Sequence, residues 1–280
     1  MTHWRTTRFE IDLARPRVMG IVNVTPDSFS DGGRDAGAAI AHCDTLLREG
    51  ADILDIGGES TRPGARTPTP GEELARVLPV LRHALTLDVP VSVDTSEPSV
   101  MRAALELGVD IVNDVRALQR PGALDAVAAH SSAGVCLMHM QGEPGTMQAT
   151  PHYADVVAEV MAFLARRRDA ALAAGIDAAR IALDPGIGFG KAVEHNLALL
   201  ARQRELLALG QPLLVGWSRK STLGAVSGRP VGERLAASVA AALMAIEHGA
   251  RIVRVHDVAA TVDAVKLWCA VSDNEQRTTR

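Results

Sequence analysis

Short apolar runs and longer amphipathic segments alternate eight times along this chain. The apolar runs are rich in Val, Ile and Leu, as is typical of strands buried on both faces of a parallel sheet. They occupy residues 17–24, 51–57, 90–94, 109–113, 134–139, 180–184, 212–217 and 251–255. The pattern therefore predicts eight buried strands.

The segments between these runs have helical spacing, and several of them end at glycine, a residue that often terminates helices. The spacing predicts helices over residues 36–49, 71–86, 97–107, 121–130, 152–174, 193–209, 230–248 and 257–271. Eight strand–helix units in roughly 250 residues match a (β/α)₈ barrel in number and size. The rival architecture is a doubly wound open sheet, which usually has fewer strands and one dominant phosphate loop. Polar signals follow every strand here, which favours the closed barrel.

We therefore predict an α/β fold, a (β/α)₈ TIM barrel, with no domain boundary in residues 1–280. The core is expected at about 17–271, and residues 272–280 are expected to form a flexible tail. The loops at 25–35 and 58–70 are long and rich in Gly, Pro, Ser, Thr and Asp. Loops of this length and composition in a compact domain are usually functional, so we expect both to be mobile loops of an active site.

Each apolar run ends in a polar or charged side chain or is followed closely by one. These side chains are Asn23, Glu59, Asp94, Asn113, His139, Asp184, Ser218 and Arg254. The carboxyl ends of barrel strands all meet at one mouth, where the active sites of such barrels lie. The eight positions are therefore expected to converge on one site.

Composition excludes several classes of function. The 280 residues carry 29 Lys and Arg against 33 Asp and Glu, a net charge of −4, which argues against general binding to nucleic acid or anionic membranes. No apolar stretch is long enough to predict a membrane span, and the first residues do not resemble a signal peptide. The three cysteines have no metal-binding spacing, which favours free thiols in a cytoplasmic protein.

Three of the strand-end residues suit a flat, nitrogen-rich ring. A carboxylate such as Asp94 or Asp184 can accept two parallel hydrogen bonds from an amino-substituted heterocycle, and Asn113 offers both a donor and an acceptor. Taken singly, each residue could equally be a helix cap or a turn residue. Their occurrence at the ends of three strands of one barrel favours a ring such as pterin or guanine.

The residues at the end of the last strand suit an anion. Arg254 binds phosphate through a fork of donors and His256 can add another, although Arg254 could instead pair with a structural carboxylate. Asn23 supplies an amide oxygen of the kind that Mg²⁺ prefers, and Asp27 and Asp31 in the next loop could assist it or serve as turn residues.

Two glycine-containing segments add further candidates. GWSRKS at 216–221 offers Ser218 and Lys220 for an anion, but it is not a Walker P-loop, since GxxxxGK[ST] is absent. DPGIGFGK at 184–191 lacks the context of a Rossmann fingerprint, and its Phe189 could stack on a planar ligand.

Taken together, the motifs resemble those of dihydropteroate synthase, the folate-pathway enzyme that sulfonamide drugs target. The resemblance covers about residues 17–270. It rests on MGIVNVTPDSFSDGG (19–33), DIGGESTRPGA (55–65), SVDT (92–95), NDV (113–115), LMHMQG (137–142), DPGIGFGK (184–191), GWSRKS (216–221) and RVHDV (254–258). Such long motifs, in this order, are specific in combination.

The resemblance implies a homodimeric (β/α)₈ barrel, a transferase that joins p-aminobenzoate to 6-hydroxymethyl-7,8-dihydropterin diphosphate and releases diphosphate. It implies that the pterin is bound by Asp94, Asn113, Asp184 and Lys220, with Met138 packing nearby. It implies that the diphosphate is bound by Asn23, Arg254 and His256 together with Mg²⁺. It places p-aminobenzoate against Thr61, Arg62, Pro63, Phe189 and Ser218. Catalysis is then expected from Asp94, Asp184, Lys220 and Arg254.

Three alternatives remain. A pterin-dependent methyltransferase uses a similar barrel, but it needs neither the TRPGA loop nor the SRKS run. A non-catalytic paralogue that binds pterin or a partner would be favoured by loss of Asn23, Arg254 or His256, and all three are present. A phosphate-binding aldolase barrel requires a Schiff-base lysine within a strand, whereas Lys191 and Lys220 are expected in loops.

Overall fold

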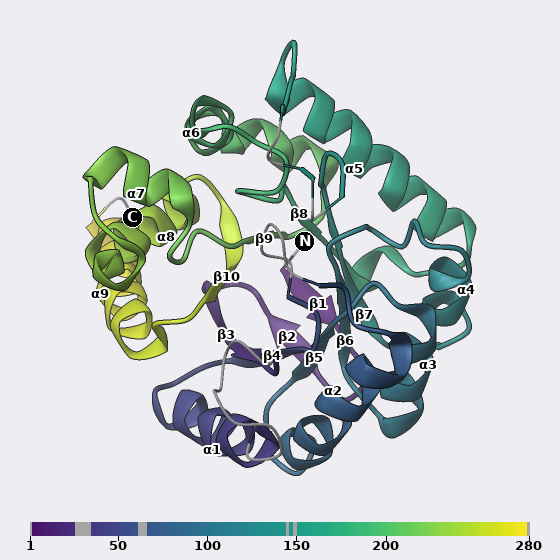
Figure 1. The fold of residues 1–280 in the computed structure, drawn as a ribbon. Coiled ribbons are helices and arrows are strands. Elements are labelled where there is room, and N and C mark those ends of the chain that lie inside the picture. Colours follow the sequence, from purple (N-terminus) through teal and green to yellow (C-terminus); the bar gives the residue numbers. More distant parts are fainter. Residues whose placement is uncertain (1, 26–34, 61–65, 144–145, 148–149, 279–280) are drawn as a thin grey trace.

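Eight parallel strands close into a barrel in the order β10-β3-β4-β5-β6-β7-β8-β9 (Figure 1). The computed structural model describes residues 2–25, 35–60, 66–143, 146–147 and 150–278. The barrel strands are β3 (Arg17–Asn23), β4 (Ile53–Gly57), β5 (Val91–Asp94), β6 (Ile111–Asp114), β7 (Gly134–Met138), β8 (Ile181–Asp184), β9 (Leu213–Val215) and β10 (Ala250–Val255). Each of the eight lies within a residue or two of an apolar run in the sequence, and the predicted (β/α)₈ barrel is confirmed.

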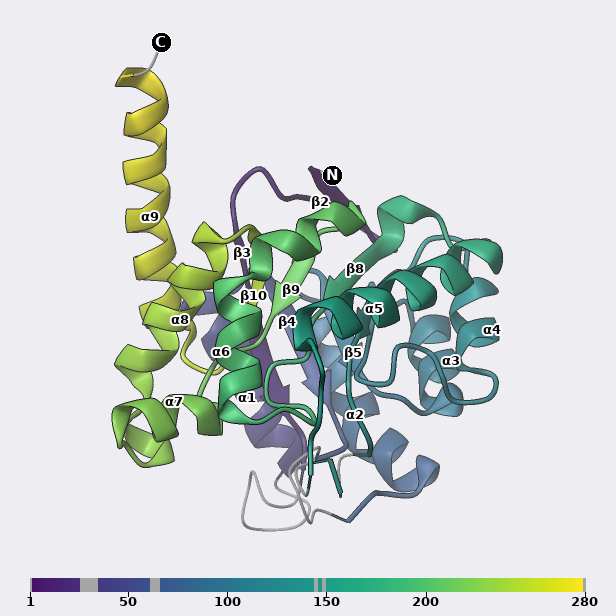
Figure 2. The same ribbon diagram turned by 90° about the horizontal axis from the view of Figure 1, so that it is seen from above.

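Helices surround the barrel on its outer side (Figures 1 and 2). They are α1 (Asp35–Arg48), α2 (Pro70–Ala84), α3 (Pro98–Leu107), α4 (Ala123–Ala128), α5 (Val156–Ala173), α6 (Val193–Ala201), α7 (Ser221–Ser227), α8 (Leu235–Glu247) and α9 (Val258–Thr278). Short 3₁₀ segments are η1 (Ala178–Arg180), η2 (Gln203–Leu209) and η3 (Val231–Glu233). The sequence pattern did not indicate α7, and it merged η2 with α6.

The end of the chain differs from the prediction. The last helix was predicted to end at residue 271, but α9 continues to Thr278, while the flexibility expected of residues 272–280 stays a prediction. The segment contains neither glycine nor proline, so no residue in it breaks the backbone hydrogen bonding of the helix. Figure 2 shows this end of α9 extending beyond the barrel.

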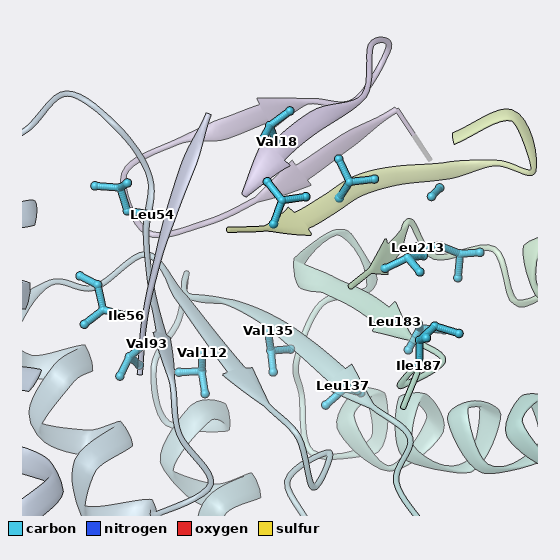
Figure 3. Close-up of a cluster of buried hydrophobic side chains, with 14 of the residues drawn as sticks. Val18, Leu54, Ile56, Val93, Val112, Val135, Leu137, Leu183, Ile187 and Leu213 are labelled. Atoms are coloured by element: carbon cyan, nitrogen blue, oxygen red, sulfur yellow. The ribbon is translucent and has the colours of Figure 1, made fainter. Parts of the chain in front are cut away.

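The outward faces of the strands form the larger hydrophobic core. Because side chains alternate between the two faces of a strand, every second residue points toward the helices. Val18, Leu54, Val93, Val112 and Val135 are among these residues, and all belong to one buried cluster with apolar residues of the helices (Figure 3). This packing fixes the strands and, with them, the direction of the inward-facing side chains.

The amino-terminal end of the barrel is closed by a β-hairpin that the sequence pattern did not reveal. Its strands β1 (His3–Arg5) and β2 (Glu10–Asp12) pair in antiparallel fashion. Trp4 is completely buried, and its indole Nε1 donates to the carbonyl of Arg180 at 2.8 Å. Trp4, Ile11 and Leu13 form a second cluster with one inward layer of strand residues, namely Met19, Ile53, Ile111, Cys136, Ala182, Leu214 and Ile252. This hydrophobic plug leaves the carboxyl-terminal mouth as the end open to a ligand.

Candidate active site

Side chains alternate between the two faces of each strand, so the residues two positions beyond the apolar plug also point into the barrel. At the carboxyl-terminal end these residues are mostly polar. Two residues beyond Ile53, Ile111 and Ile252 come Asp55, Asn113 and Arg254, and the same step from Cys136 and Ala182 gives Met138 and Asp184. Asp94 lies two residues beyond the buried Ser92 of β5. The predicted ring-binding residues Asp94, Asn113, Met138 and Asp184 therefore share one inward-facing layer at the mouth.

Arg254 lies between two carboxylates of this layer. Its Nε donates to Asp55 at 2.6 Å and its Nη2 donates to Asp94 at 2.8 Å. Asn113 Nδ2 also donates to Asp55, at 3.1 Å. Carboxylates on β4 and β5 thus both pair with this guanidinium, so Arg254 does pair with carboxylates of the protein, the alternative role that the sequence allowed.

Asp55 is a residue of this layer that was not predicted from the sequence. Its carboxylate is 0% exposed and accepts from both Arg254 and Asn113, while its Oδ1 has no partner among the described residues. The signal was present in the sequence, since Asp55 is a charged residue in the middle of the apolar run ILDIG. A buried charge needs a partner, so such a residue predicts a cation within reach on another strand of the barrel.

Burial shifts the pKa values of the two predicted ring-binding carboxyl groups upward. Burial raises the pKa of Asp184 to about 6, against the opposing hydrogen bond from Gly186 N–H at 2.7 Å. Burial also raises the pKa of Asp94, against the opposing charge of Arg254. Asp184 therefore gains most of its negative charge only as the pH approaches neutral, in a region where water screens charge poorly.

Lys220 and Phe189 meet at the rim of this layer. Lys220 Nζ lies 4.2 Å from the centre of the Phe189 ring, a distance at which a cation is attracted to the aromatic face. Burial lowers the pKa of Lys220 to about 8. The two side chains come from different loops, after β9 and after β8, and they form one wall with a flat apolar face and a positive charge.

Ser218 and His256 form a hydrogen-bonded pair beside Arg254. Ser218 Oγ accepts from the backbone N–H of His256 at 3.1 Å and lies 3.0 Å from His256 Nδ1. Burial lowers the pKa of His256 to about 3, so the imidazole is neutral at physiological pH. Ser218 therefore orients the ring of His256.

Glu59 and His139, to which the sequence assigned no role, are each paired with a basic side chain near the mouth. Arg116 Nη1 lies 3.5 Å from Glu59, just before the loop that contains Thr61. Lys191 Nζ donates to His139 Nδ1 at 2.8 Å and to the carbonyl of Gly186 at 2.9 Å. Arg116 and Lys191 were not assigned to the site from the sequence, because their side-chain partners Glu59 and His139 are distant in the sequence.

Asn23 lies at the end of β3, beside Gly57 of β4. Its side chain makes no hydrogen bond to the residues that the structure describes, which leaves its amide oxygen for a ligand. The same described residues contain no group of three His, Cys, Asp or Glu that could hold a metal by themselves. The remaining candidates Asp27, Asp31, Thr61, Arg62 and Pro63 lie outside the described residues.

A separate cavity of about 400 Å³ lies between the loops after β6 and β7. Two arginines line it, but Arg116 is paired with Glu143 at 3.0 Å and Arg120 with Glu97 at 3.1 Å. The described residues that line this cavity include no lysine or histidine, whereas the barrel mouth brings Lys220 and His256 close to Arg254, so the cavity is a weaker anion site than the mouth.

A barrel with a plugged amino-terminal end and a mouth of carboxylates, amide, lysine and arginine defines a (β/α)₈ enzyme that binds a polar, partly anionic small molecule. Residues 19–256 match the family described as pterin binding enzyme. The chain is 54% identical over 279 residues to dihydropteroate synthase of Neisseria meningitidis serogroup B, covering 97% of this chain and 98% of that one.

Two solved structures agree with this match. Dihydropteroate synthase of Xanthomonas albilineans with 4-aminobenzoic acid has a TM-score of 0.89 and 55% identity, covering 94% of this chain and 95% of that one. The Burkholderia cenocepacia enzyme complexed with 7,8-dihydropteroate has a TM-score of 0.90 and 51% identity, covering 99% and 98%. This chain belongs to the dihydropteroate synthase family of pterin binding enzymes. None of the helices in the described part of the chain is long and apolar enough to cross a membrane.

Proposed function

We propose that this protein joins p-aminobenzoate to 6-hydroxymethyl-7,8-dihydropterin diphosphate, forming 7,8-dihydropteroate and diphosphate for folate biosynthesis. The observation that carries the proposal is the inward layer of Asp94, Asn113 and Asp184 around the guanidinium of Arg254. The relatives in complex with 4-aminobenzoic acid and 7,8-dihydropteroate support the same reactant and product for this chain.

The inward layer has hydrogen-bonding groups for both parts of the pterin substrate, the ring and the diphosphate. We propose that Asp94, Asn113 and Asp184 bind the ring, with Lys220 donating to it and Met138 packing against it. Arg254 has five N–H groups, and it donates only two hydrogen bonds to the residues that the structure describes. The remaining donors, together with His256, are then suited to bind diphosphate oxygens without loss of the carboxylate contacts.

A Mg²⁺ ion fits the donors on this side of the mouth. Asn23 would hold it through its amide oxygen, since Mg²⁺ needs few protein ligands when phosphate oxygens and water complete its shell. When bound, the ion would neutralise charge on the departing diphosphate. Arg254 and His256 would act on the same oxygens from the strand β10 side.

The hydrogen bonds of Ser218 suggest a role for it that differs from the one implied by resemblance. For His256 to donate from Nε2 to a phosphate oxygen, its neutral ring must accept at Nδ1, and the only proton of the Ser218 hydroxyl must be donated there. Ser218 then has no proton left for the carboxylate of p-aminobenzoate. We therefore propose that Ser218 orients His256, while Phe189 stacks on the p-aminobenzoate ring.

The chemistry follows from these positions. As the C–O bond to diphosphate breaks, positive charge develops on the methylene carbon and spreads into the pterin ring. The carboxylates of Asp94 and Asp184 stabilise that charge, and preorganised charges in a poorly solvated site act strongly. The amine of p-aminobenzoate attacks the carbon and then loses a proton. An aniline is nucleophilic while neutral, so the step needs no strong general base.

The test is diphosphate release from the pterin diphosphate, measured with and without p-aminobenzoate, in Mg²⁺ and in excess chelator. Release and dihydropteroate formation are expected to require both p-aminobenzoate and Mg²⁺. No p-aminobenzoate-dependent product in Mg²⁺ would overturn the proposed function. For the dissociative step, a secondary deuterium isotope effect clearly above unity is expected at the reacting methylene, and a value near unity would contradict it.

We further propose that the protein is a cytosolic homodimer. Its three cysteines are buried free thiols, as expected in a reducing compartment. Large apolar side chains are exposed on the consecutive segments α7, η3 and α8, where Val226 is 64%, Val231 59% and Leu235 47% exposed. A second copy that covers this surface would remove them from water.

Light scattering is expected to give the mass of two chains for the unmodified protein. Val231→Asp should shift the protein toward one chain, because a charge in an apolar interface is costly. Leu172→Asp is the matched control, since Leu172 is an exposed apolar residue on α5, far from α7 and α8 in Figure 1. A monomeric unmodified protein, or equal effects of the two substitutions, would contradict this interface.

A further inference from the structure

The wall formed by Phe189 and Lys220 depends on two loops that are not continuous in the sequence. Phe189 follows β8 and Lys220 follows β9, and their side chains meet at 4.2 Å. Gly188, the neighbour of Phe189, has a φ of +79°, and a Cβ built on it would lie 3.1 Å from Cδ of Lys220. The backbone of one loop therefore rests on the side chain of the other, so a shift in either loop changes the wall.

One buried side chain joins these two loops. Asn196, in the first turns of α6, is 1% exposed. Its Oδ1 accepts from the N–H of Gly188 at 2.8 Å, and its Nδ2 donates to Thr222 Oγ1 at 3.0 Å. Thr222, in α7, follows Lys220 by two residues and is also buried. Asn196 thus bonds to a residue adjacent to Phe189 on one side and to a residue close to Lys220 on the other.

An amide is the side chain that this position requires. The Gly188 side presents a donor, whereas the opposite side presents the hydroxyl of Thr222 and the carbonyl of Ala192, the latter at 2.9 Å. Only a group that accepts at one atom and donates at the next satisfies both sides. Lys191 also supports the first loop, through the carbonyl of Phe189 at 3.0 Å, but its described hydrogen bonds do not reach α7.

We propose that Asn196 is a positioning residue that holds the Phe189 loop against Lys220 and thereby sets the width of the p-aminobenzoate pocket. This inference rests on the proposed function, because it assigns the wall to p-aminobenzoate. Asn196 itself does not touch the substrates. Its effect is expected on p-aminobenzoate more than on the pterin, whose proposed main partners Asp94, Asn113 and Asp184 are held by strands.

The test compares Asn196→Ala with Gln203→Ala. Gln203 is another amide that is 1% exposed, and its Nε2 donates to the carbonyl of Ala245 at 2.8 Å, between α8 and η2 rather than between the site loops. Both substitutions remove a buried amide and should lower the melting temperature. Asn196→Ala alone is expected to raise KM for p-aminobenzoate about tenfold, with the affinity for the pterin diphosphate changed less than about threefold.

Thr222→Val is the second variant, because it keeps the shape of the side chain and removes only the partner on α7. A rise of about threefold in the same KM is expected, with little loss of stability. If the unmodified protein is active, either of two results would overturn this inference and leave the proposed function intact. One is an unchanged KM in both Asn196→Ala and Thr222→Val, and the other is an equal rise in KM in Asn196→Ala and Gln203→Ala. If the unmodified protein shows no p-aminobenzoate-dependent turnover, both this inference and the proposed function fail.

Discussion

Replacing Arg254 by methionine is expected to lower kcat/KM for the pterin diphosphate by about a thousandfold or more and to destabilise the fold. The guanidinium is bonded to Asp55 at 2.6 Å and to Asp94 at 2.8 Å, and the Asp55 side chain is fully buried. Without Arg254, two neighbouring carboxylates remain without a compensating charge. Breaking a buried ion pair from one side typically costs about 3–5 kcal/mol. The same change removes the forked donor that we assign to diphosphate.

The stability loss in Arg254→Met is expected to depend on pH. Burial already raises the folded-state pKa of Asp94 against the charge of Arg254, so without the cation this pKa should rise further above its value in the unfolded chain. A carboxyl group whose pKa is raised on folding binds protons more tightly in the folded state, so stability falls as pH rises through that pKa. Urea unfolding at pH 5 and pH 8 should therefore show the larger loss at pH 8.

Two variants serve as controls for Arg254→Met. Arg254→Lys keeps the charge but not the fork, so it should recover part of the stability and little of the activity. Arg202 forms exposed ion pairs with Asp155 and Glu205, and Arg202→Met should change stability by less than about 1 kcal/mol. If Arg254→Met unfolds at the same urea concentration as the unmodified protein, the guanidinium does not stabilise the two carboxylates.

Replacing Asp184 by asparagine is expected to weaken pterin binding without lowering the stability of the fold. The carboxylate is proposed to accept two hydrogen bonds from the pterin, and hydrogen bonds to charged groups are each worth about 1.5–3 kcal/mol. Asparagine has one acceptor oxygen, which can still accept from Gly186 N–H, but it presents an amino group toward the ring. The affinity for the pterin should therefore fall about a hundredfold or more, as measured by calorimetry.

The fold should tolerate Asp184→Asn well. Burial raises the folded-state pKa of Asp184 from 3.8 to about 6, so the ionised carboxylate costs the folded protein stability once the pH has risen through that window. Asparagine removes this cost, and the melting temperature at pH 7 should be unchanged or higher. In the unmodified protein, kcat/KM should decline as the pH falls through about 6. Equal losses of stability and affinity in Asp184→Asn would indicate a structural role instead.

The periodic patterns in the sequence were sufficient to predict the barrel and most of its inward polar layer. Asp94, Asn113 and Asp184 are strand-end residues in a parallel sheet, and such residues must meet at one mouth whatever the detailed packing. The N-terminal hairpin was not predicted because its strands are only three residues long, too short to show a period of two. The helical continuation of α9 was missed because a polar segment without glycine or proline is compatible with either helix or disorder.

Sequence alone therefore determined the class of fold, the end of the barrel at which the candidate site lies and, through long motifs, the family. The tertiary structure determined which charged side chains form ion pairs. The register and shear between strands place Arg254 between Asp55 and Asp94. Loop conformation allows Asn196 to join Gly188 to Thr222. Those contacts link residues that are 8 to 199 positions apart. Local periodicity shows which face a residue occupies, whereas the choice of partner across the barrel is made only when the sheet closes and the buried charges must pair.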